Sequence, residues 1–213
     1  MKQEVVLKIT LFLMVLLLFG LNEISGQNLD NKILNSIHEE RNKQFDPFFH
    51  VFGQSGPILS IAYPIGFGLA GIFKSDSSLF VQGISAGFGL SFCAILAYGL
   101  KEAIRRPRPF QQNKEIIVPY NAPKSYSFVS GHTSNAFETA MHLSLSCKKW
   151  YVVLPAFGWA STVAYSRVHE GVHYPSDVLA GAILGTGSAW LTYKANKFIG
   201  RKTAKTRRKI LKW

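Results

Sequence analysis

The chain has 213 residues, enough for one domain, of which 47% are hydrophobic and 17% are charged. The charged share lies below the roughly one quarter that is typical of soluble domains. The net charge of +12 favours an anionic membrane surface or an anionic substrate as partner. It does not indicate nucleic acid, because no base-reading motif and no aromatic-interleaved groove accompanies it. The two cysteines, Cys93 and Cys147, suggest neither a metal pair nor a disulfide framework.

The first residues have the pattern of a secretory signal peptide. Two lysines precede an apolar run over 9–21, and small residues follow that run. We expect residues 1–26 to be a signal peptide that is cleaved after Gly26. An uncleaved membrane anchor is the alternative, because Ile24 stands where a cleavage site prefers a small residue.

Five further apolar runs predict a helix bundle embedded in a membrane. They cover residues 57–73, 79–100, 133–147, 150–166 and 178–193. The second run is long enough to span a bilayer, the first and fifth are marginal, and the third is short and needs polar partners inside a bundle. The expected fold is all-α, a polytopic bundle of about five transmembrane helices over residues 27–195. Apolar residues at helical spacing over 29–42 predict an additional short amphipathic helix at the membrane interface.

The distribution of lysine and arginine predicts how this bundle is oriented. If residue 27 lies outside the cytoplasm, then Lys74, Lys148 and the basic tail over 196–213 face the cytoplasm, as the positive-inside rule requires. The tail then contacts either solvent or the membrane surface. The loop over 101–128 lies on the opposite, periplasmic face of a bacterial-type inner membrane. Four cations there break the charge rule and suggest a bound anion: Lys101, Arg105, Arg106 and Arg108.

Three stretches on the predicted periplasmic face carry the candidate site. They are KEAIRRPRP (101–109), SFVSGHTSNAF (127–137) and SRVHEGVHYPSD (166–177). In this order and spacing they resemble the type 2 phosphatidic acid phosphatase superfamily, which includes bacterial acid phosphatases and vanadium haloperoxidases. Its pattern is K-x6-R-P, then P-S-G-H, then S-R-x5-H-x3-D. This sequence departs from it at Val129, where the family has a proline that would shape the turn rather than contact phosphate.

The matching positions contain groups that suit phosphoryl transfer, which depends mainly on positioning and charge neutralisation. Lys101, Arg108 and Arg167 are candidates to bind the non-bridging phosphate oxygens. Ser130 and Gly131 stand where the third apolar run begins as a helix, and backbone N–H groups at a helix start favour a phosphate.

The candidate catalytic residues are two histidines and one aspartate. His173 is the expected nucleophile, which forms a phosphohistidine. Asp177 lies four residues later, so it can orient the imidazole if a helix begins at Pro175. His132 is the expected general acid for the leaving group and the later general base for water. The resemblance implies that neither a metal nor a cofactor is required.

The resemblance also implies a lipid phosphate as substrate. Candidates are undecaprenyl diphosphate, phosphatidate, phosphatidylglycerol phosphate and the phosphates of lipid A. Three alternatives stay open: a soluble periplasmic acid phosphatase with the same site, a vanadate-dependent haloperoxidase, and a non-catalytic membrane protein that binds phosphate. The sequence does not indicate an oligomeric state.

Several polar residues near the motifs receive no firm role. Arg105 and Arg106 either meet a lipid head group or face water. His169 and Glu170 fall in the variable part of the third motif, where we expect a solvated loop. Glu138 and His142 share one face of a predicted helix, so they either pair with each other or line the bundle.

Overall fold

The computed structural model describes residues 23–112, 117, 119 and 121–210, and within them the ordered structure is helical, with no strand. The helices are α2 (Glu23–Glu39), the 3₁₀ helix η1 (Lys43–Phe45), α3 (Asp46–Phe73), α4 (Ser77–Ile104), α5 (Pro109–Gln112), α6 (Gly131–Cys147), α7 (Trp150–His169) and α8 (Pro175–Ile210). The all-α prediction is therefore confirmed for this part of the chain. The predicted signal peptide falls mainly on residues 1–22, which lie outside the described residues.

The five apolar runs all form helices, but two of these helices extend well beyond the runs. α3 begins at Asp46, ahead of the apolar run, because Pro47 suits a first helical turn and the aromatic residues that follow are compatible with a helix. α8 begins at Pro175, as predicted, and continues through most of the basic segment to Ile210. Alanine, lysine and arginine are strong helix formers, so this segment has no reason to end the helix at residue 195.

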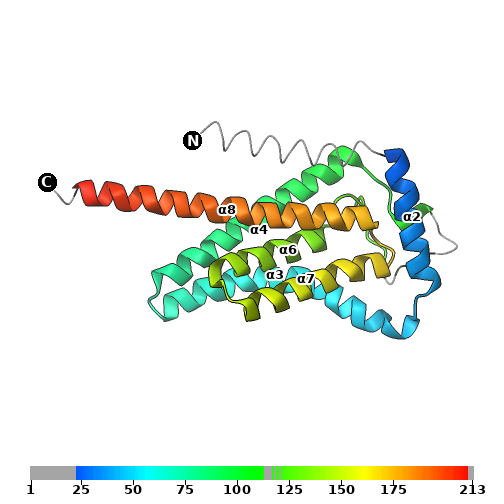
Figure 1. Ribbon diagram of the computed structural model, residues 1–213, viewed down its shortest axis with the longest axis horizontal. Helices are drawn as coiled ribbons and strands as arrows, with labels where there is room; N and C mark the ends of the chain where they lie inside the picture. Colours follow the sequence, from blue (N-terminus) through cyan, green and yellow to red (C-terminus); the bar gives the residue numbers. More distant parts are fainter. Residues whose placement is uncertain (1–22, 113–116, 118, 120, 211–213) are drawn as a thin grey trace.

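The five long helices pack lengthwise, with α6 among the other four (Figure 1). Glycines allow the close approach of their backbones. A Cβ atom at Gly185 of α8 would lie 2.1 Å from the carbonyl oxygen of Ser134 in α6. A Cβ atom at Gly83 of α4 would lie 2.5 Å from the backbone nitrogen of Gly68 in α3. These contacts give close helix packing of the kind that small residues permit in lipid.

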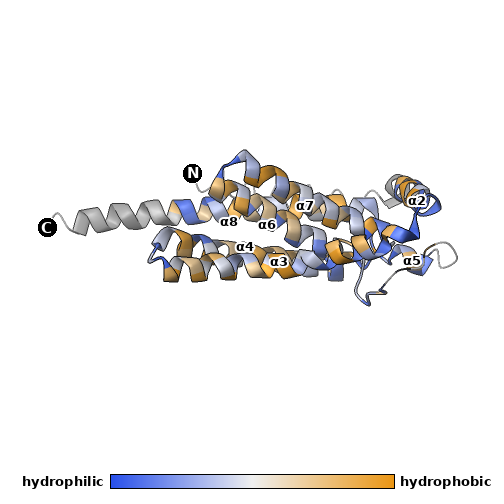
Figure 2. Ribbon diagram, turned by 90° about the horizontal axis from the view of Figure 1, so that it is seen from below, coloured by the Kyte–Doolittle hydropathy of each residue, from blue (hydrophilic) through white to orange (hydrophobic). Residues whose placement is uncertain are grey.

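Much of the outer surface of the bundle is apolar. Hydrophobic residues follow the middle of the long helices, whereas hydrophilic residues gather at their turns (Figure 2). Two described segments, Lys43–Phe73 and Ser77–Gln112, are long and apolar enough to cross a membrane. α6, α7 and α8 do not meet this criterion, so the expected count of five spans stays a prediction.

The two ends of the bundle differ in what they carry. The α3–α4 turn at Lys74 and the α6–α7 turn at Lys148 lie toward the same end of the bundle, and α8 runs past them on that side (Figure 1). α2 crosses the other end, where Leu34 is buried against Ile117, Val168 and Tyr174. α2 is thus a docked part of the fold, and it covers the end at which the three sequence motifs lie.

Candidate active site

The three motifs meet at the ends of four helices. The first motif follows the last turns of α4, the second begins α6, and the third joins α7 to α8. The Ser130 side chain caps α6 by accepting a hydrogen bond from the Thr133 N–H, and the Ser130 N–H donates to the carbonyl oxygen of Asp177 at 3.1 Å. This bond ties the start of α6 to the start of α8, so the second and third motifs are held side by side.

His173 and Asp177 face each other at the start of α8. The His173 side chain is buried, and its Nδ1 lies 3.6 Å from Oδ2 of Asp177. The same Oδ2 accepts hydrogen bonds from the Ser127 hydroxyl and, at 2.9 Å, from the Tyr174 N–H. The carboxylate is therefore fixed by neighbours other than the histidine that it faces.

The tautomer of His173 follows from its other neighbour. Its Nε2 lies 3.3 Å from Nη1 of Arg108, and a guanidinium can only donate. Nε2 therefore has a free electron pair, and Nδ1 carries the hydrogen that points toward Asp177. Burial lowers the pKa of the His173 imidazole to about 3, which keeps the ring neutral at physiological pH. A neutral ring with an unprotonated Nε2 is the form that can act as a nucleophile.

Lys101 and Arg108 are held in place by backbone carbonyl groups. Lys101 Nζ donates to the carbonyl oxygen of Tyr126 at 2.8 Å, and Arg108 donates to those of Ser125 and Val172 at 2.6 Å each. Neither cation forms an ion pair with a carboxylate in the described part of the chain. Arg108 is buried and Lys101 is half-buried, and cations shielded from water without a contacting counter-charge are costly, so this arrangement favours the binding of an anion.

Arg167 is positioned by its own helix end and by α3. Its Nη2 lies 3.0 Å from Oε1 of Glu170, which in turn lies 3.1 Å from Nδ1 of His50. The guanidinium rests on Gly53 of α3, where any Cβ atom would overlap it. This close approach explains the glycine and fixes Arg167 from two sides.

His132 lies in the first turn of α6, and its side chain makes no hydrogen bond to another described residue. The charges of Arg167, Arg108 and Lys101, the three predicted phosphate-binding cations, all act on it. At Gly131, no protein atom comes within 4 Å of the place that a Cβ would take. The space beside Gly131 is therefore open, which leaves room for a phosphate at this helix start.

Arg106 takes neither of the two positions expected from the sequence. Its Nη1 donates to Oδ1 of Asp177 at 2.8 Å, and its Nη2 donates to Oδ2 of Asp30 in α2 at 2.7 Å. The guanidinium also stacks on the Tyr174 ring, 3.9 Å from its centre. Arg105 is exposed and donates only to the carbonyl oxygen of Glu102 among the described residues.

Sequence reasoning missed Asp30 and Ser127. Asp30 links α2 to the site, since it also accepts a hydrogen bond from the Ser176 N–H at 2.9 Å. One signal was present: Asp30 lies four residues before Leu34, on the face of the amphipathic helix that becomes buried. Nothing in the sequence marked Ser127 as a partner of Asp177.

The expectation of a solvated loop at His169 and Glu170 is wrong. These side chains are only 4% and 2% exposed. His169 Nε2 lies 2.9 Å from Oδ1 of Asp46, and Glu170 holds Arg167. The early start of α3 is the reason, because its first turns cover the end of α7.

Glu138 and His142 line the bundle and do not pair with each other. His142 bonds to the Tyr63 hydroxyl through Nδ1 at 3.0 Å and to the Ser85 hydroxyl through Nε2 at 3.3 Å. Glu138 is buried beside Gly89 of α4.

Val129 stands at the position of the family proline. It is fully buried in an apolar cluster of α4 and α8, and the peptide bond before it is cis.

Comparison with known proteins identifies the family to which this site belongs. The sequence profile of the PAP2 superfamily matches residues 82–201, more than half of the chain, and this range contains all three motifs. The chain belongs to the PAP2 superfamily. The resemblance seen in the sequence is therefore confirmed.

Individual PAP2 relatives are similar over parts of the chain. Lipid A 4'-phosphatase of Bacteroides thetaiotaomicron is 33% identical over 99 residues, 44% of each chain. Undecaprenyl-diphosphatase of Sulfolobus acidocaldarius is 32% identical over 122 residues, 57% of this chain and 56% of that protein. This chain thus spans about half the length of these two relatives.

A solved PAP2 structure has the same fold. The crystal structure of the transmembrane PAP2 type phosphatidylglycerolphosphate phosphatase from Bacillus subtilis superimposes with a TM-score of 0.71 at 23% identity, over 89% of this chain and 96% of that one. The PAP2 helix arrangement thus extends well beyond the three motifs. The described residues contain no group of three or more histidine, cysteine or acidic side chains suited to a metal ion.

Proposed function

We propose that this PAP2 protein removes phosphate from a membrane lipid by way of a phosphohistidine. One observation carries the proposal: Lys101 and Arg108 have no carboxylate in contact among the described residues, and they lie beside the buried, neutral His173. An anion that reaches this point meets positive charge and a nucleophile together. A phosphoester is the substrate class that needs both.

The first step transfers the phosphoryl group to the enzyme. Lys101, Arg108 and Arg167 bind the non-bridging oxygens, together with the N–H groups that begin α6. His173 Nε2 attacks phosphorus while the bond to the leaving oxygen breaks. The negative charge of the bound phosphate offsets the three cations and favours the protonated form of His132. His132 in this form gives its proton to the leaving oxygen, so the lipid alcohol or lipid phosphate leaves without added charge.

The second step returns the enzyme to its starting state. Asp177 keeps the hydrogen on His173 Nδ1 and stabilises the positive charge of the phosphorylated ring. Water attacks phosphorus, and His132 accepts its proton as the phosphorus–nitrogen bond breaks. Inorganic phosphate then leaves. Neither step calls for a metal ion, so we propose a metal-independent reaction.

The same proposal includes a multi-pass protein in a bacterial-type inner membrane, with the site on the periplasmic face. Large apolar side chains are exposed along α3 and α4, and the basic turns gather at the end opposite the site. Both features fit five spans under the positive-inside rule. The exposed apolar side chains also argue against the soluble acid phosphatase, because a monomer in water rarely exposes so large an apolar surface.

The substrate is a lipid that carries a phosphomonoester or a diphosphate. Relatives are named for lipid A and undecaprenyl diphosphate, and the solved structure with the same fold for phosphatidylglycerolphosphate. The site as described reads the phosphate alone, so any of these lipids satisfies its chemistry.

A phosphate-release panel on the purified full chain in detergent tests the proposal. We expect release from at least one of undecaprenyl diphosphate, phosphatidate, phosphatidylglycerol phosphate and lipid A, unchanged by a chelator and inhibited by vanadate. Vanadate binding without release from any lipid would instead identify a phosphate-binding protein. Release of the protein from membranes by a carbonate wash would overturn the membrane location.

A further inference from the structure

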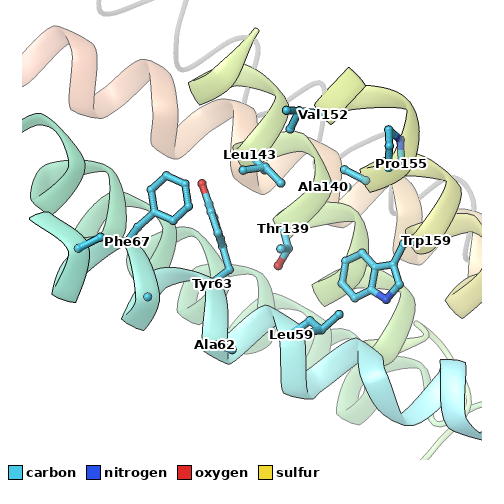
Figure 3. Close-up of a pocket in the computed structure, with 13 residues that line it drawn as sticks. Leu59, Ala62, Tyr63, Phe67, Thr139, Ala140, Leu143, Val152, Pro155 and Trp159 are labelled. Atoms are coloured by element: carbon cyan, nitrogen blue, oxygen red, sulfur yellow. The ribbon is translucent and has the colours of Figure 1, made fainter. Parts of the chain in front are cut away.

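α2 places a buried carboxylate at the end of the bundle where the three motifs meet. This carboxylate belongs to Asp30, which is 5% exposed and lies outside the residues that match the family profile. The apolar groove between α3, α6 and α7 cannot act on the reacting groups by charge in this way. Its lining, which includes Leu59, Tyr63 and Trp159, contains neither a carboxylate nor a cation (Figure 3).

Asp30 caps a helix other than its own. The N–H groups in the first turn of a helix have no partner within that helix. α8 begins at Pro175, and the Ser176 N–H in its first turn donates to Oδ1 of Asp30 at 2.9 Å. The Ser176 hydroxyl donates to Oδ2 of the same carboxylate. A carboxylate at this place also interacts favourably with the helix dipole, so Asp30 stabilises the helix start that carries Asp177.

Asp30 also shares one arginine with Asp177. Arg106 donates through Nη2 to Oδ2 of Asp30 at 2.7 Å and through Nη1 to Oδ1 of Asp177 at 2.8 Å. These two carboxylates and one guanidinium together carry one net negative charge. If Asp30 were neutral, the charge of Arg106 would cancel that of Asp177.

This net charge bears on the proposed intermediate. The His173 ring gains one positive charge when it is phosphorylated, and its Nδ1 faces Oδ2 of Asp177 at 3.6 Å. Asp177 stabilises that charge as a carboxylate does in other catalytic groups of this kind. Asp30 offsets Arg106, so the negative charge of Asp177 remains available to the ring.

We propose that Asp30 is a positioning residue for phosphoryl transfer, which acts through Arg106 and the start of α8 to keep Asp177 in place and its charge available to His173. The inference rests on the proposed function and extends the site to α2. The hydrogen-bond partners of Asp30 are Arg106 and Ser176, and none of the three phosphate-binding cations is among them. Its charge should therefore contribute to kcat and not to the binding of substrate.

A matched pair of substitutions on α2 tests this role. Asp30→Asn keeps the size of the side chain and an oxygen for the Ser176 N–H, so it removes the charge and leaves the cap. Glu39→Gln makes the same change at an exposed position of the same helix. With a lipid substrate that releases phosphate, we expect Asp30→Asn to lower kcat by about tenfold with KM nearly unchanged, as for partners of a catalytic group. Glu39→Gln should change neither constant, and thermal midpoints in detergent check that each variant is folded.

Combination with Arg106→Gln gives the sharpest test. Arg106→Gln alone leaves two carboxylates without the cation between them, and the added Asp30→Asn restores one net negative charge. We therefore expect the double variant to have a kcat about twofold or more above that of Arg106→Gln. A side chain that only holds α2 in place would give additive losses instead. The comparison also serves if Asp30→Asn alone folds poorly, because the double variant has no unpaired arginine charge.

The outcomes separate this inference from the proposed function. No phosphate release by the unmodified protein from any lipid of the panel would overturn the phosphatase proposal itself. Normal release by the unmodified protein, with the same kcat in Asp30→Asn, would overturn only the role of Asp30. A rise in KM at constant kcat, or a double variant no faster than Arg106→Gln, would overturn it too, because Asp30 would then not act through Arg106 on the reacting pair.

Discussion

His173 with Asp177 and Glu138 with His142 each form a pair of a histidine and a carboxylate four residues apart, and the surroundings of these two pairs differ. His173 and Asp177 lie where four helices end, and Arg106 binds the carboxylate at 2.8 Å. Glu138 and His142 lie inside α6, where Oε1 of Glu138 has no hydrogen-bond partner among the described residues. Spacing alone therefore does not distinguish the two pairs.

The two pairs differ in the positive charge and in the free space that surround them. Three cations surround the end where His173 lies, and a Cβ at the nearby Gly131 would meet no protein atom. Glu138 and His142 form the interior pair, and no cation forms an ion pair with Glu138 in the described part of the chain. There is also little room beside them, since a Cβ at Gly89 would lie 2.3 Å from Glu138. A reactive pair needs a partner charge for its substrate and room for it, and only the first pair has both.

The largest effect that we expect separates the two histidines. His173→Ala should lower phosphate release by about 10³-fold or more, because it removes the proposed nucleophile. His142→Ala, which removes bonds to Tyr63 and Ser85, should keep activity within about threefold and lower only the thermal midpoint. Phosphate release from one lipid substrate measures the first effect and thermal unfolding in detergent the second. Equal losses of activity in the two variants would contradict the assignment of the reaction to the first pair.

We expect an effect of intermediate size on activity from replacing Arg106, which binds the carboxylate of the first pair and not that of the second. Arg106→Gln removes the bonds to Asp177 and Asp30, and we expect kcat to fall by about 10- to 100-fold with KM nearly unchanged, as for partners of a catalytic group. Arg106→Lys should recover part of the loss. A rise in KM at constant kcat would instead indicate that Arg106 binds substrate.

Arg105 is the control that separates the positive charge of Arg106 from its hydrogen bonds. Arg105→Gln removes the same charge one residue away, from an exposed side chain that contacts neither aspartate. We expect no change in kcat. If Arg105→Gln and Arg106→Gln slowed the reaction equally, the general positive charge of the loop, and not the hold on Asp177, would be responsible.

Local sequence was enough to predict the helices and the meeting of the motifs. The apolar runs predicted the central parts of the long helices, and Pro175 predicted where α8 begins. The early start of α3 was missed because residues 46–56 mix aromatic, polar and glycine residues and form no apolar run. That missed segment supplies Gly53 and Asp46, which explains why the burial of Glu170 and His169 was also missed.

Contacts between distant residues were the part that sequence patterns could not predict. Arg106 and Asp30 are separated by 76 residues, and neither lies in a matched motif position. Their pairing depends on where α2 docks, and that depends on the burial of Leu34 against residues of the α7–α8 turn. A motif specifies the groups that contact a substrate, whereas the groups that position them follow from tertiary packing.

The smallest effect that we expect concerns the carboxylate of the interior pair. Glu138→Gln keeps the shape of the side chain and removes an ionisable group that makes no ion pair in the described structure, so activity should stay within about twofold. The free energy of unfolding should change by about 1 kcal/mol or less, since one unsatisfied buried group replaces another. A loss of kcat as large as that of Arg106→Gln would mean that the interior pair takes part in the reaction. Glu138 contacts neither the cations nor His173, so such a loss would have to reach the proposed site through the packed helices, along α6 or through α4 and α8, whose Gly89 and Gly185 lie against Glu138.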